Sequence, residues 1–124
     1  IGVRLVGSEM CIRDRSKGNF QGADLTDADL SNANLKEANL SRANLENAYM
    51  VRANLTKASL SSAKCKNASM TFANLNSCDL RNANLSSASL HGADLTRADL
   101  TSAITEGTNF KSAKLIGTKG YKSS

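Results

Sequence analysis

The chain is dominated by a five-residue repeat that runs without an insertion from Gly18 to Gly117, through 20 units. The first unit reads GNFQG, a typical one reads ADLTD, and the last reads AKLIG. All 17 alanines of the chain occupy the first position of a unit, and 14 of the 15 leucines occupy the third. This period constrains the fold more than any other property of the sequence, because each unit must repeat one local structure.

A five-residue period fits neither an α-helix nor a flat β-strand. On a helix, five residues rotate by about 500°, so an apolar stripe would drift by about 140° per unit. On a strand, residues five apart point to opposite faces. The chain must therefore change direction in every unit, so that positions one and three, two residues apart, both point inward. Positions two, four and five carry mostly Asn, Asp, Ser, Thr, Lys and Arg, and we expect them to face water.

The units of the form A-(D/N)-L-x-x resemble those of pentapeptide-repeat proteins, and the resemblance covers residues 18–117. It implies an all-β fold, a right-handed quadrilateral β-helix with four units in each 20-residue coil. About five coils at the strand spacing of about 4.8 Å would make a rod of roughly 24 Å. The inward assignment of positions one and three comes from the pattern itself, whereas the handedness and the four-sided section come from the resemblance.

Residues 20 apart then form ladders inside the coil. One ladder places Met50 beside Met70, where flexible side chains can fill an irregular gap. Phe110 falls in the last coil, where a large side chain can cover an open end. Cys65 and Cys78 occupy inward positions on different faces and in different coils, so we expect two buried thiols with no disulfide between them.

The register divides the chain into a leader of residues 1–17, a repeat domain of residues 18–117 and a tail of residues 118–124. The leader stretch VGSEMCIRDR resembles a translated adaptor or vector sequence, so we expect residues 1–15 not to be native. A capping or disordered arm is the alternative, since the ends of solenoids often need covering. No function is inferred from Cys11 or Arg13 in either case.

The net charge of +5 lies mostly outside the repeats. The leader holds four basic and two acidic residues, the tail two lysines, and the repeats ten basic and nine acidic residues. Some pentapeptide-repeat proteins imitate DNA and bind type II topoisomerases, which requires a strongly acidic surface. Duplex DNA carries one charge per about 1.7 Å, or roughly 14 over 24 Å. The near-neutral repeats therefore disfavour a DNA mimic.

Nucleic-acid binding is also disfavoured, because it calls for a coherent basic stripe with stacking aromatics. Lys64 and Lys66 share one predicted face with the acidic Asp24, Asp27 and Glu46, whereas Lys36 lies on another. A solvated surface of mixed charge is the simpler interpretation.

Catalysis, metal binding and cofactor binding have no supporting motif. His91 is the only histidine and is outward by register, and no CxxC pair is present. A filled rod without loops offers no concave site on which catalytic groups can converge. We therefore expect no enzyme, cofactor, metal site or small-molecule substrate. The sequence has no apolar run of about 18 residues, so we also expect no membrane span.

One group of outward residues departs from the polar background. Tyr49, Val51 and Phe72 fall on the third face in adjacent coils, with Arg52 nearby and His91 one coil further on. An exposed apolar group with an aromatic ring and an arginine is typical of contact sites. The alternatives are tolerated surface variation or a patch covered by the leader or tail.

These observations predict a non-catalytic structural or protein–protein interaction module, with a DNA-mimic regulator of a type II topoisomerase as the alternative. The expected partner is a protein, and the unpaired coil ends also allow an end-to-end homodimer. Buried free cysteines favour a reducing compartment such as the cytoplasm. The resemblance leaves the thylakoid lumen open as well.

Overall fold

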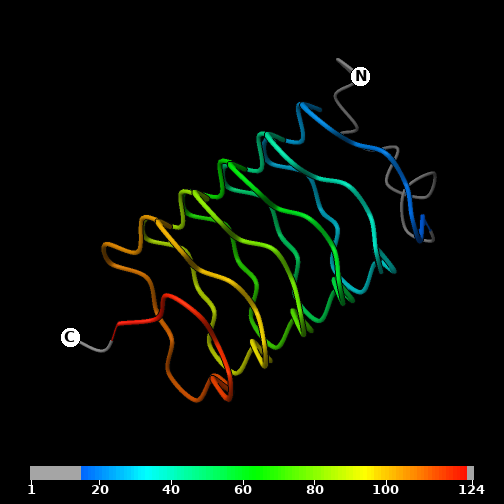
Figure 1. Ribbon diagram of the computed structural model, residues 1–124. Coiled ribbons are helices and arrows are strands. Elements are labelled where there is room, and N and C mark those ends of the chain that lie inside the picture. The colour runs from blue at the N-terminus through cyan, green and yellow to red at the C-terminus, as the bar shows by residue number, and fades with distance from the viewer. Residues whose placement is uncertain (1–14, 123–124) are drawn as a thin grey trace.

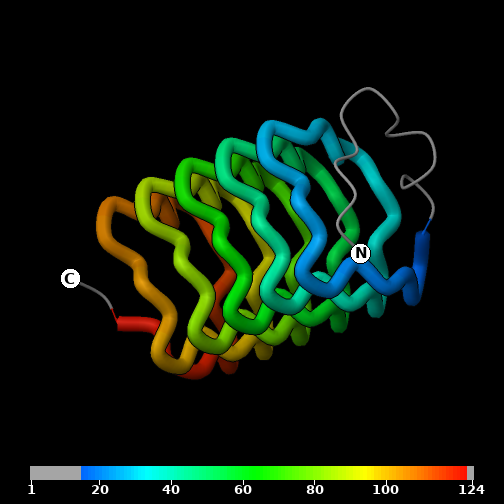
Figure 2. The backbone as a smooth tube through the Cα atoms, turned by 90° about the horizontal axis from the view of Figure 1, so that it is seen from above, coloured from blue at the N-terminus to red at the C-terminus, as the bar shows by residue number. Residues whose placement is uncertain are grey.

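The computed structural model describes residues 15–122, so Cys11, Arg13 and nearly all of the suspected non-native leader lie outside the described residues. Within that range the chain contains no helix and no strand longer than a single bridge. Seventeen parallel bridges instead join residues 20 apart, from Asn19–Asn39 to Asp99–Lys119. The chain is a right-handed quadrilateral β-helix, whose coils stack into a rod (Figure 1) and follow the same path side by side (Figure 2). The predicted fold class is confirmed.

Backbone hydrogen bonds between coils hold the rod together. In a central unit, the Asn54 N–H donates to the Ala33 carbonyl of the preceding coil at 2.8 Å. The Leu55 N–H donates to the Asn74 carbonyl of the following coil, also at 2.8 Å, and the Lys57 N–H bonds to the same following coil at 2.9 Å. Positions two, three and five of a unit are therefore all satisfied by neighbouring coils.

A tight turn at each corner changes the direction of the chain. The Ala58 N–H donates to the Leu55 carbonyl at 3.0 Å, which closes a four-residue turn. Its third residue, Lys57, has a φ of 59°. A positive φ at this position alone marks a type II turn. Every fifth residue from Lys17 to Gly117 shares this conformation, and most of these residues are not glycine.

The side chain at position two satisfies the remaining backbone donor of the unit, the N–H of position four. Asn54 Oδ1 accepts from the Thr56 N–H at 3.1 Å and from the Thr56 hydroxyl at 2.7 Å. Asp94 and Asp99 make the same pair of bonds to the threonines two residues on. The recurrent Asn or Asp is thus an Asx-turn acceptor, which explains the second letter of the repeat.

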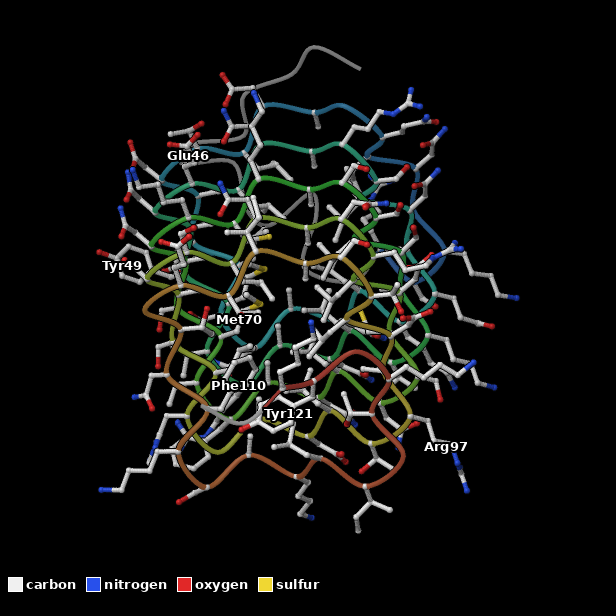
Figure 3. All side chains as sticks on the ribbon, turned by 60° about the vertical axis from the view of Figure 1, so that its left-hand side comes forward. Glu46, Tyr49, Met70, Arg97, Phe110 and Tyr121 are labelled. Atoms are coloured by element: carbon white, nitrogen blue, oxygen red, sulfur yellow. The ribbon has the colours of Figure 1, made fainter. Side chains whose placement is uncertain are left out.

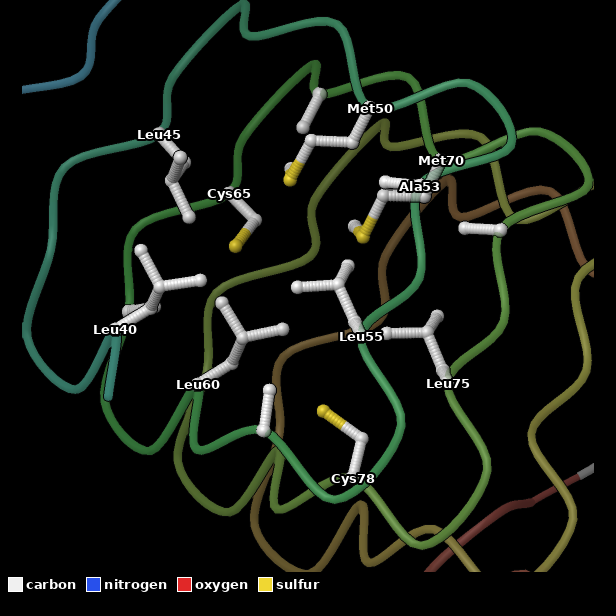
Figure 4. Packing of buried hydrophobic residues seen from close by; sticks show 14 of the residues in the cluster. Leu40, Leu45, Met50, Ala53, Leu55, Leu60, Cys65, Met70, Leu75 and Cys78 are labelled. Atoms are coloured by element: carbon white, nitrogen blue, oxygen red, sulfur yellow. The ribbon is translucent and has the colours of Figure 1, made fainter. Parts of the chain in front are cut away.

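The interior is filled by the side chains at positions one and three of the units, as predicted (Figure 4). From Ala23 to Leu100, every residue at positions one and three is at most 2% exposed, and no buried residue in the described range is polar or charged. Cys65 and Cys78 are both free and buried, as expected. Burial raises the pKa of Cys65 to about 12 and also raises that of Cys78, so both thiols stay protonated and unreactive at neutral pH.

The last coil is less well covered than those before it. Phe110 is half-buried and packs edge-on against Tyr121, with ring centroids 5.1 Å apart. Ile104 and Ile116 remain 46% and 76% exposed. The bridge between Asp99 and Lys119 extends the ladder two residues beyond the last repeat unit.

Candidate interaction surface

The five candidate contact residues all lie on one side of the rod. We call this side face three and define it as residues 28–32, 48–52, 68–72, 88–92 and 108–112, which follow one another at intervals of one coil. Tyr49 is 55% exposed and Phe72 is 50% exposed, so neither lies under the tail. Figure 3 shows the Tyr49 side chain at the outer edge of the rod.

Two of the candidates, Arg52 and His91, each contact the ring of a third, Phe72. The Arg52 guanidinium carbon lies 5.4 Å from the ring centroid, in a cation–π contact. His91 meets the same ring edge-on, with centroids 5.4 Å apart and an interplanar angle of 73°. We call Arg52, Phe72 and His91 the Phe72 stack. The stack presents an aromatic ring and a cation to solvent.

Gly92 makes room for this stack. A Cβ atom added at Gly92 would lie 2.4 Å from Phe72 Cε1 and 2.5 Å from Cδ1. The Phe72 ring therefore occupies the space that a side chain at residue 92 would need. Sequence reasoning did not single out Gly92, although it stands 20 residues after Phe72 and so one coil below it.

Tyr49 and Val51 lie on face three beside the stack. Tyr49 pairs through its backbone with Asp29 in the preceding coil and with Ser69 in the following one. Within residues 15–122, neither Tyr49 nor Val51 makes a ring contact with the Phe72 stack. The structure thus joins three of the predicted residues and places the other two nearby.

Face three also lacks its Asx acceptors in three successive coils. Position two is Asp29 in the first coil and Asn109 in the last, and each accepts from the N–H two residues on. In the three coils between them, position two is Tyr49, Ser69 and Ser89. No other face lacks the acceptor in consecutive coils of the 18–117 repeat.

The loss of these acceptors leaves backbone donors on the surface. Among residues 15–122, the N–H groups of Val51 and Thr71 have no protein acceptor. The His91 N–H reaches only the Ser89 hydroxyl, at 3.5 Å. The Thr71 hydroxyl instead lies 3.2 Å from that of Ser89. The sequence does show that Asn or Asp is missing at position two of these units. The structure was needed to show that this residue accepts a hydrogen bond from the N–H of position four.

The charges near the stack are few. Arg52 is the only charged residue in the three middle coils of face three, and it makes no ion pair within the described part of the chain. The ion pair between Arg81 and Asp79, at 2.8 Å, lies on another face. Hydrogen bonding to Arg81 lowers the pKa of Asp79. Arg52 is therefore the one formal charge beside the Phe72 stack among residues 48–52, 68–72 and 88–92.

A hollow of about 690 Å³ lies at the C-terminal end of the rod. It is lined by Ala103, Ile104, Phe110, Tyr121 and residues near them. Across residues 15–122, no three His, Cys, Asp or Glu side chains gather as a metal site would require. No helix of that range is long and apolar enough to cross a membrane.

Comparison with known proteins agrees with this architecture. The sequence profile of the family "Pentapeptide repeats" matches residues 16–42, 38–76, 63–101 and 93–119. A search of curated proteins found no significant match.

Among solved structures, a pentapeptide repeat protein from the cyanobacterium Cyanothece 51142 is 41% identical, with a TM-score of 0.58 over 77% of this chain. This chain spans only 58% of that protein's length. A pentapeptide repeat protein from Nostoc PCC 7120 is 28% identical, with a TM-score of 0.69 over 88% of this chain and 98% of its own. One from the thylakoid lumen of Arabidopsis thaliana is 27% identical, with a TM-score of 0.57 over 89% and 68% of the two chains.

Proposed function

Because the chain belongs to the pentapeptide-repeat family, we propose that it is a non-catalytic interaction module that binds a protein partner through face three. The rod is held by its interior columns and its coil-to-coil hydrogen bonds. Many of its outward residues can therefore vary at a smaller cost in stability than the inward ones. A rigid, continuous surface of this kind suits partner recognition.

The observation that carries the proposal is the exposed Phe72 stack with Tyr49 beside it. Phe72 is 50% exposed and Tyr49 is 55% exposed, and the other exposed large apolar residues of the described range, Ile104 and Ile116, lie in the last coil. Aromatic residues and arginine are enriched in protein interfaces, and Tyr and Arg are also enriched among the residues that carry most of the binding energy. Burying the exposed parts of the two rings under a partner would remove apolar surface from water.

The test is a quantitative pull-down with the double variant Tyr49→Ser/Phe72→Ser. Serine already occupies position two of face three at Ser69 and Ser89, and position five elsewhere at Ser62, so the fold tolerates both changes. The matched control is Lys64→Ser/Arg97→Ser, which makes the same replacement at positions two and five of other faces. We expect the face-three variant to lose a partner that the control keeps. Retention of every partner by both variants would remove the basis of the proposal.

The alternative of a DNA mimic has no support from the surface charge. The repeats carry nine acidic and ten basic residues, and the stack itself is built around a cation. A surface that imitates phosphates needs an excess of acids along the rod. The expected result in a gyrase supercoiling assay is no inhibition.

A further inference from the structure

The N–H groups of Val51 and Thr71 are directed to the outside of the rod. In units that carry an Asx acceptor, the same N–H points to an oxygen of an outward side chain, as the Ser31 N–H does to Asp29 at 3.1 Å. Val51 and Thr71 hold the equivalent position in the next two coils, and both are half-buried rather than covered. Because stacked coils lie about 4.8 Å apart, the two donors form a short column on the surface.

The Phe72 stack flanks this column with a cation. Arg52 lies over the Phe72 ring, 5.4 Å from its centroid. A guanidinium that uses its face for a ring keeps its N–H donors, which lie in its plane, for a carboxylate. No acidic residue occurs in residues 48–52, 68–72 or 88–92, so nothing on this part of face three competes for Arg52.

We propose that this surface binds an acidic peptide segment of a partner protein. Carboxylates of the segment accept hydrogen bonds from the Val51 and Thr71 N–H groups and from Arg52, and so supply in trans the acceptors that Asn or Asp supplies elsewhere in the rod. An apolar side chain of the segment packs against Phe72 and Tyr49. The inference rests on the proposed function, since it names the chemistry of the partner at the same site.

Charge complementarity favours a carboxylate-bearing peptide over a nucleic acid. Phosphates would accept the same hydrogen bonds, but binding to nucleic acid depends on many cations along the backbone. The middle of face three offers one cation, Arg52, together with unpaired neutral donors and an apolar contact surface. This combination fits a few carboxylates beside an apolar anchor.

The test uses a fluorescein-labelled peptide of Glu-Glu-Leu repeats as the probe, and fluorescence anisotropy as the readout. A peptide with Gln in place of every Glu is the matched probe without charge, and a labelled oligodeoxythymidylate tests the nucleic-acid class. We expect the acidic peptide to bind at least about tenfold more tightly than the Gln peptide, since hydrogen bonds to charged groups are the stronger ones. Equal binding of the two peptides, or tighter binding of the oligonucleotide, would overturn the inference.

The variant Ser69→Asn tests the backbone donors directly. An asparagine at this position restores the acceptor in cis, and it should occupy the Thr71 N–H without a change in net charge. We expect Kd for the acidic peptide to rise about tenfold in Ser69→Asn, and also in Arg52→Gln. Ser59→Asn makes the same change on face one, and Ser69→Ala leaves the donor free, so both should bind as the unmodified protein does. Unchanged binding in Ser69→Asn would contradict the use of these donors.

The two proposals fail in different ways. Absence of peptide binding, together with loss of a cellular partner in Tyr49→Ser/Phe72→Ser, would overturn the acidic-peptide class and keep face three as a contact surface. If Tyr49→Ser/Phe72→Ser kept every cellular partner and still bound the acidic peptide, both the proposed contact surface and the acidic-peptide proposal would be overturned.

Discussion

The substitution Gly92→Ala should destabilise the rod in two ways, by straining the backbone and by displacing the Phe72 ring. The new Cβ would lie 2.4 Å from Phe72 Cε1, a distance that requires the ring to move. Half of that ring is already exposed, so it is free to swing into solvent. It would then lose its contacts with Arg52, whose guanidinium carbon is 5.4 Å from the ring centroid, and with His91, whose ring centroid is also 5.4 Å away.

The expected cost has two separable parts. Residue 92 has a φ of 68°, and holding an alanine in the left-handed region costs about 1–2 kcal/mol. Losing an edge-to-face ring pair costs about 0.5–1.5 kcal/mol. Losing an exposed cation–π contact costs a further 0.5–1 kcal/mol or so. The free energy of unfolding should therefore fall by about 2–4.5 kcal/mol in total.

A double-mutant cycle with Phe72→Ser isolates the second part. With the ring absent, Gly92→Ala should cost only the strain of about 1–2 kcal/mol. Gly22→Ala provides the reference, because Gly22 has a similar φ of 69° and its added Cβ would meet nothing within 4 Å. Urea unfolding followed by circular dichroism measures all the variants. An equal cost of Gly92→Ala with and without the Phe72 ring would refute the packing argument.

Three further predictions concern the rod itself. Leu80→Ala should lower the free energy of unfolding by about 2–5 kcal/mol, measured by urea unfolding, because Leu80 is fully buried and its removal leaves a cavity. Asn54→Ala should cost about 1 kcal/mol in the same assay, because the Thr56 N–H loses its acceptor. In a series of thermal melts at decreasing pH, the melting temperature of the double variant Asp94→Asn/Asp99→Asn should fall less below about pH 4 than that of the unmodified protein. Hydrogen bonds from the neighbouring threonines lower the pKa of both carboxyls, so they stabilise the fold above that pH and the benefit is lost as acid protonates them. A melt series with an unchanged slope would contradict this last prediction.

The interior was predictable because the same five-residue pattern recurs in 20 units. Ala at position one and Leu at position three were assigned inward from their two-residue spacing, and the buried columns confirm them. Departures such as Cys65 and Met70 kept the same register, so they too were placed inside correctly. A period read over many units averages out the ambiguity that any single five-residue segment would carry.

The corners were not predictable to the same degree. The sequence marked positions four and five as polar, but residues as different as Lys57, Phe72 and Asn47 share a positive φ at position five. Backbone closure of each coil imposes that conformation on whichever residue stands there, and side-chain preference has little influence. The Asx acceptor was likewise interpreted only as surface polarity, because its partner is a backbone group that a sequence does not display.

The sequence identified the candidate surface by its unusual residues, but it did not predict which of their side chains contact one another. Register alone placed Tyr49, Arg52, Phe72 and His91 on one face. It did not show that Arg52 and His91 both contact Phe72, because that depends on the direction in which each side chain leaves its corner. The role of Gly92 follows only from the structure, in which the Phe72 ring fills the space that a side chain at residue 92 would need.

The stability of the rod and the specificity of its surface are separable in this architecture. Burial of positions one and three, with the coil-to-coil hydrogen bonds, maintains the fold whatever stands at position two. Each missing Asx acceptor costs about one hydrogen bond, or roughly 1 kcal/mol. Face three lacks the Asx acceptor at Tyr49, Ser69 and Ser89 in successive coils, and only the His91 N–H finds a substitute, the Ser89 hydroxyl at 3.5 Å. In the same place it exposes two aromatic rings and an arginine that has no ion pair in the described part of the chain. The backbone donors that the fold leaves open at this place are the ones that the proposed partner would use.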